Sequence, residues 1–336
     1  MISVRRSSKE DITDIMDFIA RYWSSEHVLA TNRSLVEWQH SSEDGCNYIV
    51  ASDNGSLVGV LGYIPTRRYD DNLGLDQNVV WLALWKVRDD YQSSIIGLKL
   101  FKVLESLEPN SVMAVNGIKL SHPPMYKALG FQVHELGQYY LANPDKPQNL
   151  LRYPTNLPLA TPISGRAILK TIDNYDLGGV KFSPIKRSPF KTIEYFRKRF
   201  TLHPFYDYKL HWIFLDGSLR AGIASRIAEH NSSRVLRVVD YIGDPNVLGQ
   251  CGSAFQKLMA EQNVEYLDFW QYGISPSIIG RAGFHKVDPN GELICPNYFE
   301  PFVPENGRIL FCVKGRLDKS FIVCRADGDQ DRPNRL

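Results

Sequence analysis

The sequence contains no long apolar run and no marked excess of one charge. It has 39 Lys and Arg residues against 37 Asp and Glu residues, a formal net charge of +2 in 336 residues. Proteins that bind nucleic acid usually carry a basic excess that neutralises phosphates, so nucleic acid is not expected as a partner. No stretch approaches the roughly eighteen apolar residues that a membrane helix needs, so no membrane partner is expected. Acidic residues interrupt the N-terminal stretch before an apolar run develops, and we therefore expect a cytoplasmic protein.

Cysteine is also scarce, and its pattern excludes the usual cysteine-based sites. The five cysteines are irregularly spaced, with no CxxC pair and no histidine at zinc-finger spacing. An odd number of scattered cysteines indicates buried thiols in a reducing compartment rather than disulfides. We therefore expect no metal. The thiols in question are Cys46, Cys251, Cys295, Cys312 and Cys324.

What the chain does have is apolar material for two cores. Its composition is 43% hydrophobic and 12% aromatic, and 336 residues exceed the usual size of one core. Ser8 and Asp11 resemble a capping box that opens a helix through about Tyr22. After it, alternation and turn signals predict a hairpin at 48–64, strands at 78–87, 111–118 and 133–142, a helix at 97–107 and a short helix within 122–131.

The order of elements repeats after a proline-rich stretch. Residues 143–165 carry five prolines and no periodicity, which predicts a linker. Beyond it follow a hairpin at 210–227, a strand at 233–243, a helix at 253–262, a strand at 264–274 and a short helix at 276–284. An internal duplication is the economical explanation. The predicted domains are 1–142 and 166–325, joined by the linker and followed by a tail at 326–336.

Two motifs in the first half resemble one enzyme family. The segment Gln92-Ser93-Ser94-Ile95-Ile96-Gly97, between a strand and a helix, is similar to the pyrophosphate loop Gln/Arg-x-x-Gly-x-Gly/Ala of the GNAT family of CoA-dependent N-acyltransferases. Ile95 stands where the family has its first glycine. The segment from Tyr126 to Phe131, "YKALGF", matches the family's later "LYekxGF" element. The corresponding loop of the second half, "GDPNVLGQCG", lacks the Gln/Arg.

The resemblance implies a fold, a co-substrate and a binding loop. The fold class is α/β (α+β), with two tandem GNAT-like domains, each a mixed, largely antiparallel sheet flanked by helices. The second domain is degenerate, and the first binds coenzyme A or a short acyl-CoA. Helix N-termini bind phosphate through unpaired amides, although Ser93 or Ser94 capping a purely structural helix is the alternative. The residues implied are Trp85, Val87, Gln92, Ser93, Ser94, Ile95, Ile96, Gly97 and Leu98.

Acyl transfer to an amine needs groups that handle protons and developing charge. The resemblance puts Tyr126 beside the thiol as a general acid, and packing under its helix is the alternative. His122 and Asp240 are candidate bases. The alternatives are helix capping or simple exposure for His122 and binding of loop amides for Asp240. Asn116 lies on a strand where its amide can bond to the substrate or simply pack. A main-chain N–H near Val87 is expected to bind the carbonyl oxygen.

The acceptor is expected to be an amino sugar. The stretches "RYWSSEHVLATNRSLVEWQH" and "ICPNYFEPF" resemble N-acyltransferases that modify nucleotide-linked 4-amino-4,6-dideoxy sugars for bacterial surface glycans. Alternative functions are transfer to a peptidoglycan precursor or a small amine, and a non-catalytic module that senses CoA or a metabolite. Candidate acceptor-binding residues, most of which have core packing as the alternative, are Trp23, His27, Trp38, Trp81, Trp270 and Tyr272.

Overall fold

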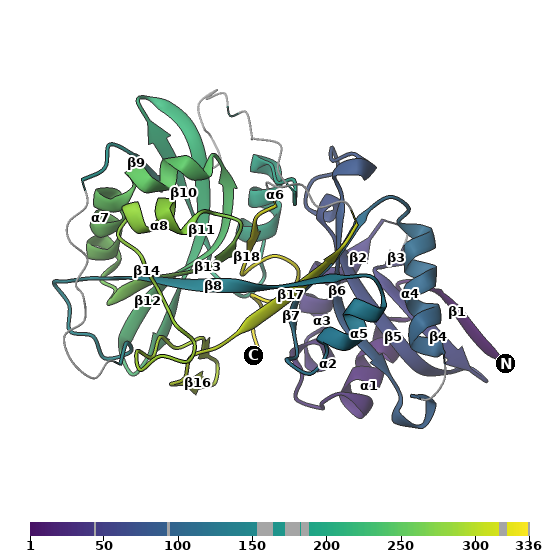
Figure 1. The fold of residues 1–336 in the computed structure, drawn as a ribbon. Helices are drawn as coiled ribbons and strands as arrows, with labels where there is room; N and C mark the ends of the chain where they lie inside the picture. Colours follow the sequence, from purple (N-terminus) through teal and green to yellow (C-terminus); the bar gives the residue numbers. More distant parts are fainter. Residues whose placement is uncertain are drawn as a thin grey trace. The chain divides into compact units, whose positions relative to one another are not determined.

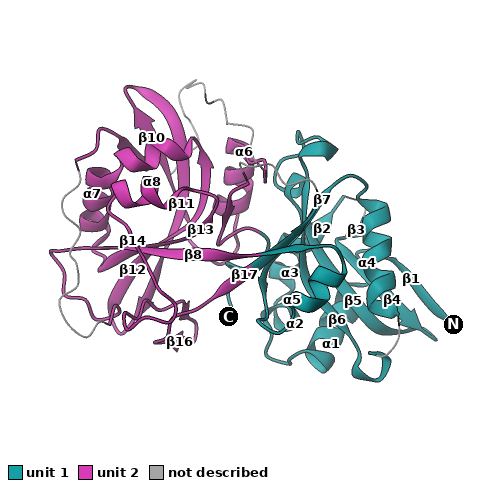
Figure 2. Ribbon diagram, viewed as in Figure 1, with its two compact units in different colours: residues 1–133, 311–317, 328–336 teal, residues 134–310, 318–327 magenta. Residues whose placement is uncertain are grey.

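The described residues form two compact units (Figures 1 and 2). The computed structural model describes residues 1–43, 45–92, 95–152, 164–171, 182, 188–315 and 321–334. Unit 1 comprises residues 1–133, 311–317 and 328–336, and unit 2 comprises 134–310 and 318–327. Within the described ranges, no helix has both the length and the apolar character required to span a bilayer.

Unit 1 is built on a mixed sheet with the strand order β1-β4-β5-β6-β7-β17. Its strands are β1 (Ile2–Arg6), β4 (Tyr48–Asp53), β5 (Ser56–Pro65), β6 (Val79–Val87), β7 (Val112–Ile118) and β17 (Ile309–Lys314). Neighbours from β1 to β6 pair antiparallel, and β6 and β7 pair parallel. Two-residue strands β2 (Ser41–Ser42) and β3 (Gly45–Cys46) form a separate pair.

Helices cover the sheet of unit 1. One apolar cluster joins the first three helices to Val50, Val60 and Leu84 of the sheet. The helices are α1 (Ile12–Tyr22), α2 (Val28–Thr31), α3 (Arg33–His40), α4 (Ile96–Leu107) and α5 (Pro123–Ala128). Short 3-10 turns lie at Thr66–Arg68, Leu75–Gln77 and Asp89–Tyr91.

Unit 2 repeats this plan with the strand order β8-β13-β12-β11-β10-β9. The strands are β8 (Gln132–Ala142), β9 (Ile168–Thr171), β10 (Lys209–Leu215), β11 (Ser218–His230), β12 (Ser233–Gly243) and β13 (Tyr266–Tyr272), with shorter β14 (His285–Lys286), β15 (Tyr298–Phe299), β16 (Phe302–Val303) and β18 (Val323–Cys324). The helices are α6 (Ile193–Phe196), continued by a π-turn at Arg197–Thr201, then a 3-10 turn at Pro245–Gln250, α7 (Gly252–Gln262) and α8 (Pro276–Arg281).

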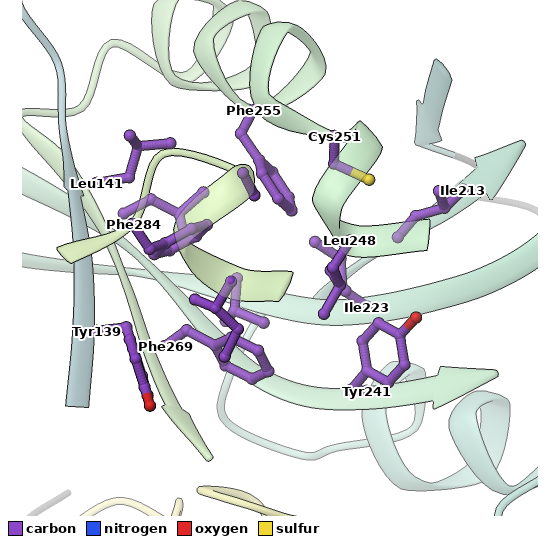
Figure 3. Packing of buried hydrophobic residues seen from close by; sticks show 14 of the residues in the cluster. Tyr139, Leu141, Ile213, Ile223, Tyr241, Leu248, Cys251, Phe255, Phe269 and Phe284 are labelled. Carbon is purple, nitrogen blue, oxygen red and sulfur yellow. The ribbon is translucent and has the colours of Figure 1, made fainter. Parts of the chain in front are cut away.

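The core of unit 2 lies between its sheet and α7 and α8. Figure 3 shows Phe255 of α7, Phe269 of β13 and Phe284, which follows α8, pointing into one apolar cluster. All three are at most 6% exposed. At about 25 cal/mol per Å² of apolar surface, each buried phenylalanine contributes roughly 1.5–3 kcal/mol to folding.

The predicted hairpins are confirmed together with their turns. Asn54 and Gly55 have φ values of +48° and +81°, and Asp216 and Gly217 have +50° and +78°. Both turns therefore have two left-handed residues, which matches the twist of the flanking strands and favours Asn, Asp and Gly. The expected thiols are also confirmed as free and buried.

Several boundaries differ from the sequence prediction. Helix α1 begins at Ile12. The Asp11 carboxylate accepts from the Ser8 amide at 2.7 Å, which is one of the two bonds of the predicted capping box, and it also accepts from Arg5 at 2.7 Å. Unit 1 ends nine residues before the predicted boundary at 142, since the end of β8 pairs with β13. Residues 328–334, predicted as part of a tail, belong to unit 1, where Asp331 is 1% exposed. Residues 153–163 of the predicted linker lie outside the described residues.

Candidate active site

Strands β6 and β7 of unit 1 part from each other halfway along their length. Their parallel pairing runs from Val79–Val112 to Leu82–Val115 and stops there. Strand β6 continues to Val87 and β7 to Ile118. A β-bulge in the pairing of β5 with β6 lies at the same level. The edge of β6 that faces β7 therefore extends beyond its last pairing with β7 at Leu82, and the C-terminal residues Gly328 and Gln330 lie beside Trp81 of β6 and Gly117 of β7.

Helix α4 begins directly after this opening. It runs from Ile96 to Leu107, and the expected boundary at Gly97 is within one residue of the observed one. The first-turn amides of a helix lack intrahelical partners and carry the positive end of the helix dipole. A Cβ placed on Gly97 would lie 3.7 Å from Trp85 Nε1, so this turn packs closely on β6.

The bulk of Ile95 does not enter the protein interior. Its side chain is 63% exposed, whereas the next residue, Ile96, is 1% exposed and anchors the helix. Leu98 is also exposed, at 44%. The exposed Gln92 donates from its side chain to Asp89 at 2.6 Å. Ser93 and Ser94 lie outside the described residues.

Tyr126 lies beside the same tryptophan. It is on α5, 6% exposed, with its ring 6.4 Å from the ring of Trp85 and 5.4 Å from that of Phe131, both edge-on. Burial raises the pKa of Tyr126, so its hydroxyl stays protonated at neutral pH. The structure thus brings together three residues predicted from sequence, Trp85, Gly97 and Tyr126, at the opening between β6 and β7.

The other candidates in unit 1 lie on β7 and at the start of α5. Asn116 is 5% exposed and follows Val115, the last residue of β7 that pairs with β6. His122 is the exposed N-cap residue of α5, and its side chain makes no capping hydrogen bond. Of the two alternatives stated for His122, the exposed position is therefore confirmed and a side-chain cap is not found.

Two acceptor candidates lie around the end of α1 and the start of α2, and a third lies on α3. Trp23 is 43% exposed, with Lys119 Nζ 5.6 Å from its ring centre and the ring of His27 at 6.2 Å. His27 caps α2 by accepting from the Leu29 amide at 3.2 Å. Burial, and then the positive charge of Arg332, lower the pKa of His27 to about 4, so it is neutral at pH 7. Trp38 of α3 is half-buried against Tyr69 and packs on the apolar cluster of this unit.

The remaining aromatic candidates are largely core residues. Trp81 and Trp270 are 1% and 2% exposed. Tyr272 is half-buried, with its ring 5.1 Å from that of His134. Burial of this kind favours packing over contact with a ligand, which was the stated alternative for most of these residues.

Asp240 does not face an open cleft. It is fully buried on β12, and Lys191 donates to its carboxylate at 2.5 Å and to that of Asp327 at 2.9 Å. Burial would lower the pKa of Lys191, but the two carboxylates outweigh it and hold that pKa well above its usual value. An ion pair this deeply buried is structural, and the prediction that Asp240 acts as a base is therefore not carried further.

Among the described residues, three side chains of this cluster lie close enough together to hold a metal ion. Asp240, Cys324 and Asp327 offer ligand atoms within 4.8 Å of one another. The ammonium of Lys191 already supplies the positive charge there, which makes the cluster a poor cation site. The sequence carried one signal of it, since an isolated carboxylate inside the apolar strand "RVVDYIG" requires a buried partner.

Comparison with known proteins shows which fold these elements form. No protein-family model and no curated protein matches the chain. Its structure is similar to that of a GCN5-related N-acetyltransferase from Anabaena variabilis, with a TM-score of 0.57 and 10% identity over 93% of this chain and 72% of the other. It is also similar to a conserved protein of unknown function from Enterococcus faecalis described as a probable N-acyltransferase, with a TM-score of 0.55 and 9% identity over 93% and 72%. The chain has the GNAT fold. Since both likenesses cover 93% of the chain, the GNAT arrangement extends over both units.

Proposed function

We propose that the protein is an N-acyltransferase that moves an acyl group from an acyl-CoA thioester to an amine, with unit 1 carrying the reaction. The observation that supports this most strongly is the grouping of Trp85, Gly97 and Tyr126 where β6 and β7 part. In this proposal the extended thioester lies where β6 and β7 part, and Tyr126 is the proton donor beside it.

The residues at the opening fit coenzyme A as the co-substrate. The amides of the first turn of α4 are suited to its diphosphate, and the absence of a Cβ on Gly97 leaves room for it. The edge of β6 beyond Leu82, around Val87, offers backbone groups to its amide-containing arm and to the thioester carbonyl. The Ile95 side chain is 63% exposed, so it lies on the surface of this loop, and CoA binding in calorimetry distinguishes an open loop from a blocked one.

Tyr126 is the general acid in this proposal. A thiol has a pKa near 8.5, so its thiolate leaves moderately well and gains from a proton donor without depending on one. Because burial keeps Tyr126 protonated at neutral pH, its hydroxyl is able to give a proton to the departing sulfur. Asn116 and the exposed His122 stay candidates for orienting the acceptor and for removing its proton.

The acceptor we propose is an amino sugar, in nucleotide-linked form, for surface glycan synthesis. Trp23 supplies an exposed aromatic face of the kind on which sugar rings stack, and Lys119 adds a positive charge next to it. This combination suits a ring that carries a phosphate. A peptidoglycan precursor or a small amine is the second candidate for the acceptor.

The test is release of free thiol from acetyl-CoA in the presence of a panel of amines. The panel holds nucleotide-linked 4-amino and 3-amino sugars, free amino sugars, peptidoglycan precursors and small amines. We expect the largest kcat/KM for a nucleotide-linked amino sugar. Release with another class corrects the acceptor, and calorimetry that detects no CoA binding, together with no release from any amine, refutes the transferase.

A further inference from the structure

Unit 2 has the same parting of strands as unit 1. Strands β12 and β13 pair parallel from Val235–Tyr266 to Val238–Phe269 and then separate. Strand β12 continues to Gly243 and β13 to Tyr272. By the order of elements, this opening corresponds to that between β6 and β7.

In unit 2, however, the chain itself fills the opening. Strand β18 pairs antiparallel with β13 through Gln271–Cys324 and Tyr272–Val323. Since β8 occupies the other edge of β13 as far as Gln271, β18 lies on the edge that faces β12. The Ala326 amide donates to the Val239 carbonyl at 2.8 Å, so the segment bridges both parted strands.

The fit of this segment is close along its length. Residues 321–327, which we call the strap, are all buried. A Cβ on Gly273 would lie 2.0 Å from the Phe321 carbonyl oxygen, so only glycine admits the strap at the end of β13. A coenzyme arm and the strap therefore cannot occupy this opening together.

Three buried charges hold the end of the strap. Lys191 bonds to Asp240, which lies on β12 just beyond its last pair with β13, and to Asp327 at the end of the strap. The Asp327 carboxylate also accepts from the Cys324 amide at 2.8 Å. The three side chains are at most 4% exposed. We call Lys191, Asp240 and Asp327 the lock.

The turn before α7 is covered as well. It corresponds to the turn before α4 in unit 1, where we propose the diphosphate binds. Here the Ala167 amide donates to the Gln250 carbonyl at 3.1 Å, and the Gly165 amide donates to Ser253 Oγ at 3.3 Å. In unit 2 the strap thus covers the opening between β12 and β13, and residues 165–167 cover the start of α7.

We propose that unit 2 has turned its coenzyme groove into a socket for the chain's own strap, secured by the lock, so that each chain binds one acyl-CoA and binds it in unit 1. The stoichiometry rests on the proposed function, whereas the socket and the lock rest on unit 2 alone. Lys191, Asp240 and Asp327 are positioning residues of the strap.

The first test measures how many coenzymes the intact chain binds. Titration calorimetry with CoA is expected to give one site per chain. Two sites overturn the socket, because the strap would then have to leave its groove. No heat at all counts against the proposed function, and in that case the thiol-labelling test decides on the socket.

The second test uses the Cys324 thiol in the strap as a reporter. In the intact protein all five thiols are buried, so a thiol-specific reagent is expected to label them slowly and through global unfolding. Lys191→Met leaves two carboxylates without their cation, and Cys324 should then be labelled at least tenfold faster than Cys251 of the same unit. Asp327→Asn, which keeps the side-chain shape, is the milder variant to use if Lys191→Met does not fold.

The matched control is Glu265→Gln, which weakens the buried hydrogen bonds of Glu265 with Asn149 and Leu150 just before β13, at the opposite end of that strand from its pairing with the strap. It should lower stability without labelling Cys324 ahead of Cys251. Equal labelling of Cys324 and Cys251 in both lock variants overturns the lock. Labelling of Cys324 ahead of Cys251 in the control overturns it too, since strap release would then follow from any loss of stability.

Discussion

Replacing Tyr126 with Phe tests the proposed reaction at a single atom. The substitution keeps the ring and its edge-on contacts with Trp85 and Phe131, and it removes only the hydroxyl. Loss of one hydroxyl should change the free energy of unfolding by no more than about 1 kcal/mol. Any large change in rate therefore reports on chemistry rather than on folding.

The size of the effect follows from two pKa values. General acids typically contribute about 10²–10⁴-fold in rate. Because burial raises the pKa of Tyr126 above that of the leaving thiol, which is near 8.5, full proton transfer is uphill even after the C–S bond has broken, and the hydroxyl acts mainly as a hydrogen-bond donor to the developing thiolate. The lower end of the range applies, and we expect kcat to fall about 100-fold, or about 2.7 kcal/mol, with KM for acetyl-CoA nearly unchanged.

The assay is steady-state thiol release at saturating acceptor, with Tyr63→Phe as the matched control. Tyr63 is on β5, 1% exposed, and burial raises its pKa to about 12, so it loses the same atom from a similar environment. The control should keep kcat within threefold of the unmodified protein. If Tyr126→Phe behaves like the control, the tyrosine only packs under α5 and the proposed acid is wrong.

Three further outcomes are expected. In Gly97→Ala the new methyl group meets only ordinary contacts, the nearest 3.7 Å away, so stability should stay the same or rise by up to about 1 kcal/mol. Calorimetry should show weaker CoA binding. An unchanged affinity would place the diphosphate elsewhere. Burial lowers the pKa of His40 from 6.5 to about 3, so the unfolded chain binds the proton first. His40 should lower the stability measured in urea by about 1.4 kcal/mol per pH unit below pH 6, in addition to the contribution of His27 down to about pH 4, and His40→Asn should remove the share of His40 only. Asp268→Ala leaves Arg237 buried without its carboxylate partner, since both side chains are 1% exposed. The free energy of unfolding, measured in urea, should fall by roughly 3–5 kcal/mol, and the additional change Arg237→Met should restore most of it.

Local signals carried most of the fold prediction. The turns at Asn54-Gly55 and Asp216-Gly217 need residues with left-handed backbone conformation. Only a few residue types favour that conformation, so both hairpins could be predicted from their turn residues. The contact between Ser8 and Asp11 was predicted from their spacing, whereas the bond from Arg5 to Asp11 was not.

The candidate site shows the same contrast between short local motifs, which could be predicted, and contacts between distant residues, which could not. Gly97 and Tyr126 were predicted because short motifs carry them, and Trp85, which has no motif of its own, lies near both in the structure. The partners of Asp240 were not predictable in this way, since Lys191 is 49 residues away and Asp327 lies at the far end of the chain. The residues around Asp240 in the sequence do not indicate which distant residues bind its carboxylate.

The lock also bears on why a duplicated fold would bury charge at all. Taking two carboxylates and an ammonium out of water is expensive, and an apolar cluster of similar volume often stabilises a protein as well or better. The charges instead fix the register of the strap against the neighbouring strands. A strand that slips by one residue turns every side chain to the opposite face. Such a slip would carry Asp327 away from both Lys191 and the Cys324 amide and leave it buried without a partner, a penalty that apolar residues alone would not impose. The buried ions therefore specify where the strap sits in its groove more than they strengthen its attachment, and a fully apolar lock is expected to yield a stable unit 2 with a less uniquely placed strap.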